Sequence, residues 1–203
     1  MSKPIEYFYS AHSAYAWLGS ARVMEVARAA GRRIEHRPMN LRRVVEAAGS
    51  VPFTERTPGH RAYFFGREMK RWAEQRGAAL MEGMPTHHRH DITLPNCLII
   101  AAIEAGHEAG RLAHALLSAH WTEDADLAEP ATLRALAERE GYPGAALLER
   151  AASDSVRARY EENTNEAITR SVFGSPTYFV DGDMFYGQDR LEMVERALRE
   201  PYR

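Results

Sequence analysis

The stretch that decides the fold is GSPTYFVDGDMFYGQDR, residues 174–190. A proline precedes a short run of β-forming residues, Thr177 to Val180, and residues 184–186 can supply a returning strand. The Asp181-Gly182 pair between them favours a two-residue hairpin turn, because both central positions of that turn need positive φ. Apolar residues then recur three and four positions apart, so a helix is expected to start near Gln188.

A second pattern occupies the N-terminal 40 residues. Residues 5–9 and 34–37 are short β-forming runs, and Pro38 ends the second one. Between them a helical pattern follows Ser13 and stops at Gly31. A strand, a helix and a strand in this order predict two parallel strands.

Helical patterns fill the middle of the chain. One begins at Thr57-Pro58, others are opened by Pro95 and by Glu129-Pro130, and a long one follows Ser153. The two ends of the chain are therefore expected to form one α/β domain, residues 1–40 and 170–203. Residues 41–169 are expected to form an all-α lobe inserted between them.

Composition excludes several classes of function. The chain has 203 residues, 45% of them hydrophobic, and a formal net charge of -2, so neither nucleic acid nor a membrane surface is an expected partner. No apolar run approaches the roughly 20 residues that span a bilayer, and the N-terminus lacks a signal-peptide core, so we expect a cytoplasmic protein. Cys97 is the only cysteine, which excludes an intrachain disulfide and a Cys-x-x-Cys pair.

Ser13 is the first candidate for chemistry. It precedes a predicted helix, where free N–H groups and the helix dipole favour an anion such as a thiolate. The alternative is an N-cap serine that only accepts a backbone hydrogen bond. His12 beside it is either a ligand contact or a surface histidine.

Three further features have ordinary alternatives. A trans bond is the commoner state for a proline such as Pro176. The run His87-His88-Arg89-His90 is expected to be a solvated loop, because adjacent histidines rarely share a metal ion without a matching partner elsewhere. Cys97 lies on an apolar helical pattern and is expected to be an inert buried thiol.

Three segments resemble the 2-hydroxychromene-2-carboxylate isomerase family, a relative of kappa-class glutathione transferases and DsbA-like oxidoreductases. They are SAYAWLG at 13–19, NTNEAI at 163–168, and the stretch from Val172 to Arg190 with its Gly-x-Pro-Thr and Gly-Gln-Asp-Arg elements. The helical middle matches in pattern only. Ala14, Ser50 and His60 depart from the family's usual proline, asparagine and lysine, and His12 is bulkier than the usual neighbour of the serine.

The resemblance implies a thioredoxin-like fold with an all-α insertion, glutathione as cofactor and usually a homodimer. Ser13 would be the catalytic serine, with a cis Ser175–Pro176 bond exposing the Ser175 backbone to the ligand. The residues implied in cofactor binding are Ser175, Pro176, Tyr186, Gly187, Gln188, Asp189 and His60, and those implied in substrate binding are His12, Ser50 and Arg56. No metal site is expected.

The resulting prediction is a glutathione-dependent isomerase of an aromatic-derived hydroxy- or oxo-carboxylate, similar to 2-hydroxychromene-2-carboxylate. One alternative is a kappa-like glutathione transferase that conjugates electrophiles. Another is a non-catalytic module that binds a thiol ligand or a protein. A dithiol oxidoreductase is rejected, because Ser13 and Ala16 occupy the places where such an enzyme needs its two cysteines.

Overall fold

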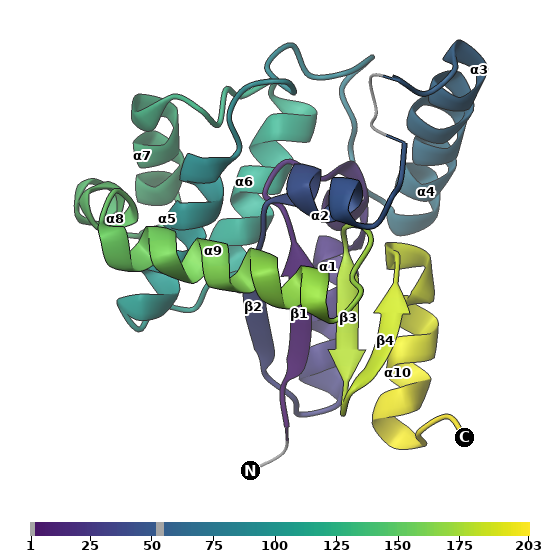
Figure 1. The fold of residues 1–203 in the computed structure, drawn as a ribbon. Helices are drawn as coiled ribbons and strands as arrows, with labels where there is room; N and C mark the ends of the chain where they lie inside the picture. The colour runs from purple at the N-terminus through teal and green to yellow at the C-terminus, as the bar shows by residue number, and fades with distance from the viewer. Residues whose placement is uncertain (1–2, 52–54) are drawn as a thin grey trace.

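A computed structural model describes residues 3–51 and 55–203 (Figure 1). Its centre is a four-stranded mixed sheet in the order β2-β1-β3-β4. The strands are β1 (Ile5–Tyr9), β2 (Ile34–Pro38), β3 (Thr177–Val180) and β4 (Asp183–Tyr186). β1 and β2 are parallel, whereas β3 pairs antiparallel with both β1 and β4. The sheet therefore joins the two ends of the chain, as the sequence predicts for this thioredoxin-like α/β fold.

The connection between β1 and β2 is α1 (Ala14–Ala29). Ser13 caps its N-terminus, and Gly31 follows its C-terminus at φ 62°, a left-handed conformation that glycine adopts without strain. The predicted strand-helix-strand unit is confirmed here.

The C-terminal hairpin is also confirmed. Asp181 and Gly182 have φ values of 53° and 98°, as a tight primed turn requires. After β4 the chain makes a 3-10 turn, η3 (Gln188–Arg190), and only then enters α10 (Leu191–Arg199), so the helix starts slightly later than predicted.

Helices occupy the chain between β2 and β3. They are α2 (Leu41–Ala47), α3 (Pro58–Arg61), the π-helical η2 (Ala62–Glu68), α4 (Met69–Arg76), α5 (Thr93–Glu104), α6 (Gly110–Thr122), α7 (Pro130–Arg139), α8 (Gly144–Ala151) and α9 (Asp154–Thr169). Thr57 caps α3, and Pro130 is the first residue of α7, both as predicted. Pro95 does not open its helix, because α5 begins at Thr93. Our sequence analysis did not identify α2, α6 or α8.

Both faces of the sheet are covered. Tyr7 and Tyr178 stack across β1 and β3 on one face, which packs on α1 and α10 within the main core. Phe8 and Phe179 pack with Ala167 of α9 on the other face, which α9 crosses in Figure 1. Because the main core contains both Tyr7 of the sheet and Leu98 of α5, the sheet and the helical region share buried contacts. The division at residues 40/41 and 169/170 stays a prediction.

The longer helices do not resemble membrane spans. α1 and α9 have 16 residues each. Within the described parts of the chain, no helix combines the length and the apolar character needed to cross a bilayer.

Candidate functional site

Ser13 lies where β1 gives way to α1, and it is 6% exposed. Its Oγ accepts the Ala16 N–H at 3.3 Å, so it caps the helix. The same hydroxyl donates to the Ser175 carbonyl at 3.2 Å. Ser13 is therefore an N-cap serine, as the alternative interpretation holds, and it also contacts the loop before β3. Capping alone does not require that second contact.

The loop at Ser175-Pro176 faces the start of α1. The Ser175–Pro176 bond is cis, as the resemblance implied. Ser175 is 8% exposed, and its Oγ accepts the Ser10 N–H at 3.3 Å. Nothing in residues 3–51 or 55–203 accepts a hydrogen bond from the Ser175 N–H, which leaves this donor open to a ligand.

The segment after β4 joins the same loop. The Gly187 N–H donates to the Pro176 carbonyl at 2.9 Å. Gly187 has a φ of 101°, which favours glycine, and a β-carbon there would also lie 2.2 Å from Asp189 Oδ1 and displace that carboxylate. Tyr186 lies over Gly174, where a β-carbon would lie 2.3 Å from its ring.

Gln188 is 1% exposed and is held by Arg76 of α4. Arg76 donates from Nε to Gln188 Oε1 and from Nη2 to the Gln188 carbonyl, both at 2.9 Å. The amide nitrogen of Gln188 is buried with no partner among the residues that the structure describes. A buried donor without an acceptor is unusual, but this nitrogen is not accessible and so does not itself mark a ligand contact. Sequence reasoning missed Arg76, because its contact spans 112 residues.

Arg56 and Asp189 lie around the Tyr186 phenol. Burial raises the pKa of Tyr186, Arg56 lowers that pKa, and Asp189 raises it. Asp189 also forms an ion pair with the neighbouring Arg190. The guanidinium of Arg56 lies 5.7 Å from the centre of the Phe64 ring. Arg56 and Asp189 thus offer opposite charges to the space beside Tyr186.

His60 and Ser50 lie at the ends of short helices. His60 belongs to α3, and its ring meets the Phe64 ring edge-on at 5.8 Å. The Tyr15 hydroxyl donates to the Phe64 backbone carbonyl at 2.6 Å, which links this segment to the first turn of α1. Ser50 donates its N–H to Val45 after α2, and no described interaction connects it to Ser13. Its assignment to substrate binding stays a prediction.

His12 is 8% exposed and belongs to a buried polar cluster. Its Nδ1 bonds Ser10 Oγ at 2.9 Å, and Asn96 Nδ2 donates to the same oxygen at 3.1 Å. Its ring lies 5.1 Å from that of His88, and His88 Nδ1 bonds His120 Nε2 at 3.0 Å. Burial is the main cause that holds the pKa of His12 well below its ordinary value and lowers that of His88 to about 4.

This arrangement corrects our expectation for the histidine run. Its members were expected to be solvated, but His88 is packed against His12, His120 and Trp121. The reason is tertiary, because α6 brings two aromatic rings to a loop whose own sequence is polar.

The outer histidines of the run behave differently. His87 and His90 approach Asp126 Oδ2 at 3.4 and 2.9 Å, with side chains 37% and 50% exposed. The three possible ligand atoms lie within 4.8 Å of one another, close enough to share a cation. Asp126 already holds both rings, so the cluster fastens this loop without an ion. The expected absence of a metal site stays a prediction.

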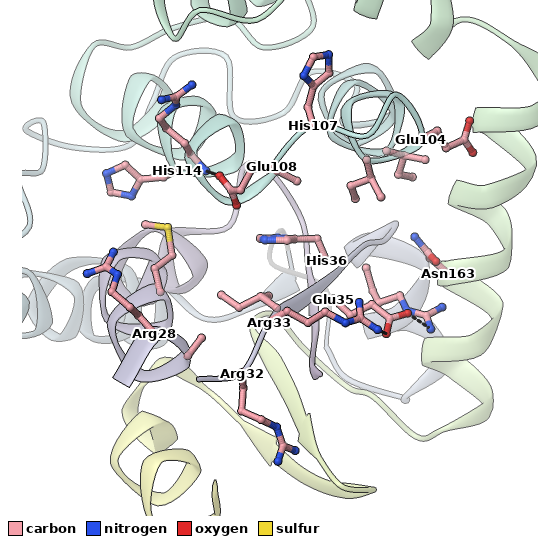
Figure 2. A pocket seen from close by; sticks show the side chains of 18 of the residues that line it. Arg28, Arg32, Arg33, Glu35, His36, Glu104, His107, Glu108, His114 and Asn163 are labelled. Carbon is pink, nitrogen blue, oxygen red and sulfur yellow. Dashed lines mark hydrogen bonds and ion pairs between the residues drawn. The ribbon is translucent and has the colours of Figure 1, made fainter. Parts of the chain in front are cut away.

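A separate cavity of about 880 Å³ lies at the outer edge of β2, among α1, α5 and α6. Figure 2 shows His36 projecting into it, with Glu108 above and Arg28 and Arg33 at its side. His36 is held by the Tyr9 hydroxyl at 3.0 Å, and burial lowers its pKa to about 4. None of the site residues predicted from the sequence lines this cavity.

Cys97 supplies no reactive thiol to the site. It is 1% exposed in α5, and burial raises its pKa to about 11. A protonated, buried thiol is a poor nucleophile. The expectation of an inert cysteine agrees with this burial, and any thiol chemistry must use an external thiol.

Known proteins of two activities resemble the chain over nearly its full length. It is 28% identical to a 2-hydroxychromene-2-carboxylate isomerase of Pseudomonas putida, over 96% of this chain and 93% of that protein. It is 23% identical to human glutathione S-transferase kappa 1, over 100% of this chain and 93% of that protein. A solved 2-hydroxychromene-2-carboxylate isomerase aligns with a TM-score of 0.78 at 26% identity, over 96% of this chain and 94% of that one.

Almost all of the chain matches one protein family. Residues 4–199 match the family described as the DSBA-like thioredoxin domain. This span includes the capped start of α1, the cis-proline loop and the β4-to-α10 turn. The chain belongs to the DSBA-like thioredoxin domain family.

Proposed function

We propose that this protein is a glutathione-dependent isomerase that acts on an aromatic-derived hydroxy- or oxo-carboxylate, similar to 2-hydroxychromene-2-carboxylate. The names of the similar isomerases and of the kappa transferase support the reaction class and the cofactor. The observation that carries the proposal is the Ser13–Ser175 contact, at a site without a cysteine. It brings a helix N-terminus against the cis-proline loop, and the thiol must then be external.

Residues around this contact fit glutathione. The open Ser175 N–H suits a peptide carbonyl of the ligand. Gln188 is assigned to the γ-glutamyl end through its place at the start of η3, since its own side-chain amide is buried. Asp189 is ionic and accessible, so it suits the ammonium group. His60 of α3 would face the glycine carboxylate, and Arg56 stays assigned to the substrate.

When bound, glutathione supplies a thiol nucleophile that is recovered at the end of the reaction. The chain's part is to favour the ionised thiol. α1 contributes its free N–H groups and dipole, and Ser13 contributes a hydroxyl proton. Rotation about the Cβ–Oγ bond lets that proton turn from the Ser175 carbonyl toward an anion.

Replacement of Ser13 with alanine tests the proposal. Turnover should fall roughly 10²- to 10³-fold, since one donor to an anion is lost. The ultraviolet absorption of the bound thiolate should appear at higher pH. Ser153→Ala is the matched control, because Ser153 caps the equally long α9 through the same type of bond. Each variant should lose about 1 kcal/mol of stability with its cap, but only Ser13→Ala should lose activity. Equal thiolate titration and turnover in all three proteins would reduce Ser13 to a cap.

Asp189→Ala tests the cofactor assignment. Loss of a charge-assisted hydrogen bond should weaken glutathione binding about ten- to a hundred-fold by calorimetry. Asp183→Ala, at the exposed start of β4, should leave the affinity unchanged. Equal affinity in both variants would place the ammonium site elsewhere.

The kappa-like transferase is the second candidate, because a kappa transferase is among the similar proteins. The mass balance of glutathione over many turnovers separates the two reactions. Recovery of glutathione means isomerisation, and stoichiometric consumption means conjugation. Tight glutathione binding without turnover of either substrate class would instead indicate a non-catalytic binding module.

A further inference from the structure

Three imidazoles form a cluster that includes His12, the residue before Ser13, and the reaction proposed above does not use them. His12 precedes α1, His88 lies in the loop before α5, and His120 lies near the end of α6. The ring centres of His88 lie 5.1 Å from His12 and 5.3 Å from His120. His12 and His120 are buried and His88 is partly buried, which costs hydration, so the hydrogen bonds that each ring makes are informative.

The bonds of His120 fix the state of His88. A backbone carbonyl can only accept, so His120 Nδ1 donates to the Ala125 carbonyl at 3.1 Å. In a neutral ring the other nitrogen, His120 Nε2, then carries a lone pair. It must accept the proton of His88 Nδ1 at 3.0 Å. His88 therefore presents a lone pair at Nε2.

The bonds of Asn96 fix the state of His12. Its Oδ1 accepts the Ala11 N–H at 3.0 Å, which orients the amide, and its Nδ2 then donates to Ser10 Oγ. The Ser10 hydroxyl proton remains for His12 Nδ1. His12 therefore carries its proton on Nε2, and the two rings present opposite groups, a donor and an acceptor.

Both Nε2 atoms lack a partner. Neither forms a hydrogen bond with the part of the chain that the structure describes, and neither is among its fully buried polar atoms without a partner. Each therefore keeps some exposed surface, although His12 as a whole is only 8% exposed. Trp121 contacts both rings' residues. Its Nε1 donates to the His12 carbonyl at 3.0 Å, and its ring centre lies 5.2 Å from that of His88.

We propose that His12 and His88 form a substrate subsite that binds an oxygen substituent of an aromatic acid. His12 Nε2–H donates to this oxygen, and His88 Nε2 accepts its proton when the oxygen is a hydroxyl. The proposal rests on the proposed function, which supplies a substrate of this class. A neutral imidazole that donates to an oxygen gaining negative charge stabilises that charge without giving up its proton.

Charge near the subsite favours an electron-rich oxygen. The Arg42 guanidinium is close enough to depress the pKa of both His12 and His88. It also donates to the Arg89 and His90 carbonyls, which holds the loop that carries His88. This positive charge near two neutral rings therefore disfavours a cation and favours an electron-rich oxygen.

A pair of matched ligands provides the test. Displacement by 2-hydroxycinnamate and by cinnamate is measured on the glutathione-loaded protein. The wild type should prefer the hydroxylated acid roughly tenfold, the worth of one to two neutral hydrogen bonds. His12→Phe and His88→Phe should lose this preference while binding glutathione normally. His114→Phe is the control, because His114 forms a similar bond to the Ser20 hydroxyl outside the subsite and should keep the preference.

A second measurement needs neither ligand nor turnover. Long-range ¹⁵N–¹H spectra should show His12 protonated at Nε2 and His88 protonated at Nδ1. The opposite tautomers, an unchanged preference in both phenylalanine variants, or no binding of either acid would overturn the subsite. The proposed function would instead be overturned if the wild-type protein does not bind glutathione, or if it consumes glutathione rather than regenerating it.

Discussion

Gly19 of α1 packs closely against Gln188, at the turn that follows β4. A β-carbon there would lie 2.7 Å from Gln188 Cβ, 3.2 Å from Tyr178 Oη and 3.4 Å from Leu191 Cδ1. Arg76 forms hydrogen bonds with both the side chain and the backbone of Gln188, so Gln188 cannot move away without breaking them. A Gly19→Ala variant must therefore push α1 away from η3.

The expected free-energy change follows from two opposing effects. Overpacking a filled interior costs about 1–3 kcal/mol, whereas alanine in place of glycine gains up to about 1 kcal/mol in a helix. The net destabilisation should be about 1–2 kcal/mol. Because Gln188 is displaced, the affinity for glutathione should fall as well.

Urea unfolding of the variant and of Gly66→Ala measures this effect. Gly66 lies inside the helical segment 58–76 with nothing within 4 Å of its added β-carbon, so that variant should gain roughly 0.5–1 kcal/mol. Opposite signs for the same substitution would confirm the close approach. If Gly19→Ala is as stable as Gly66→Ala, α1 and Gln188 do not pack as described.

Two further predictions concern buried titratable groups. Cys97→Ala should leave turnover unchanged, and loss of activity in the folded variant would contradict an external thiol. Because burial raises the pKa of Cys97 to about 11, the native thiol should react with a thiol reagent at about pH 8 only after unfolding. The pKa of His36 is lowered by burial from 6.5 to about 4, so the unfolded chain takes up a proton first as the pH falls, and stability present above pH 6.5 is lost toward pH 4. Between about pH 7.5 and about pH 5 His36 should lower the free energy of unfolding by about 2 kcal/mol. Urea unfolding over this range should show a loss of stability in His36→Asn that is smaller than in the native protein by about that amount.

The sequence by itself determined the elements whose causes are local. The Asp181-Gly182 turn depends on two residues that tolerate positive φ, and the structure has both in that conformation. The start of α1 depends on one serine oxygen that reaches an N–H three residues later. The family motifs at residues 13–19 and 172–190 depend on the same short-range patterns.

Only the tertiary structure decided which polar groups meet. The Ser13–Ser175 bond spans 162 residues, and the Arg76–Gln188 bond spans 112. The histidine run is predicted to be a solvated loop because adjacent histidines rarely share a metal ion, but α6 supplies the imidazole that bonds His88 and partly covers it. The sequence patterns do not indicate helix α6, and they predict that Pro95 opens a helix that in fact begins at Thr93. Burial and hydrogen-bond partners are set by segments far apart in sequence, so no local pattern records them.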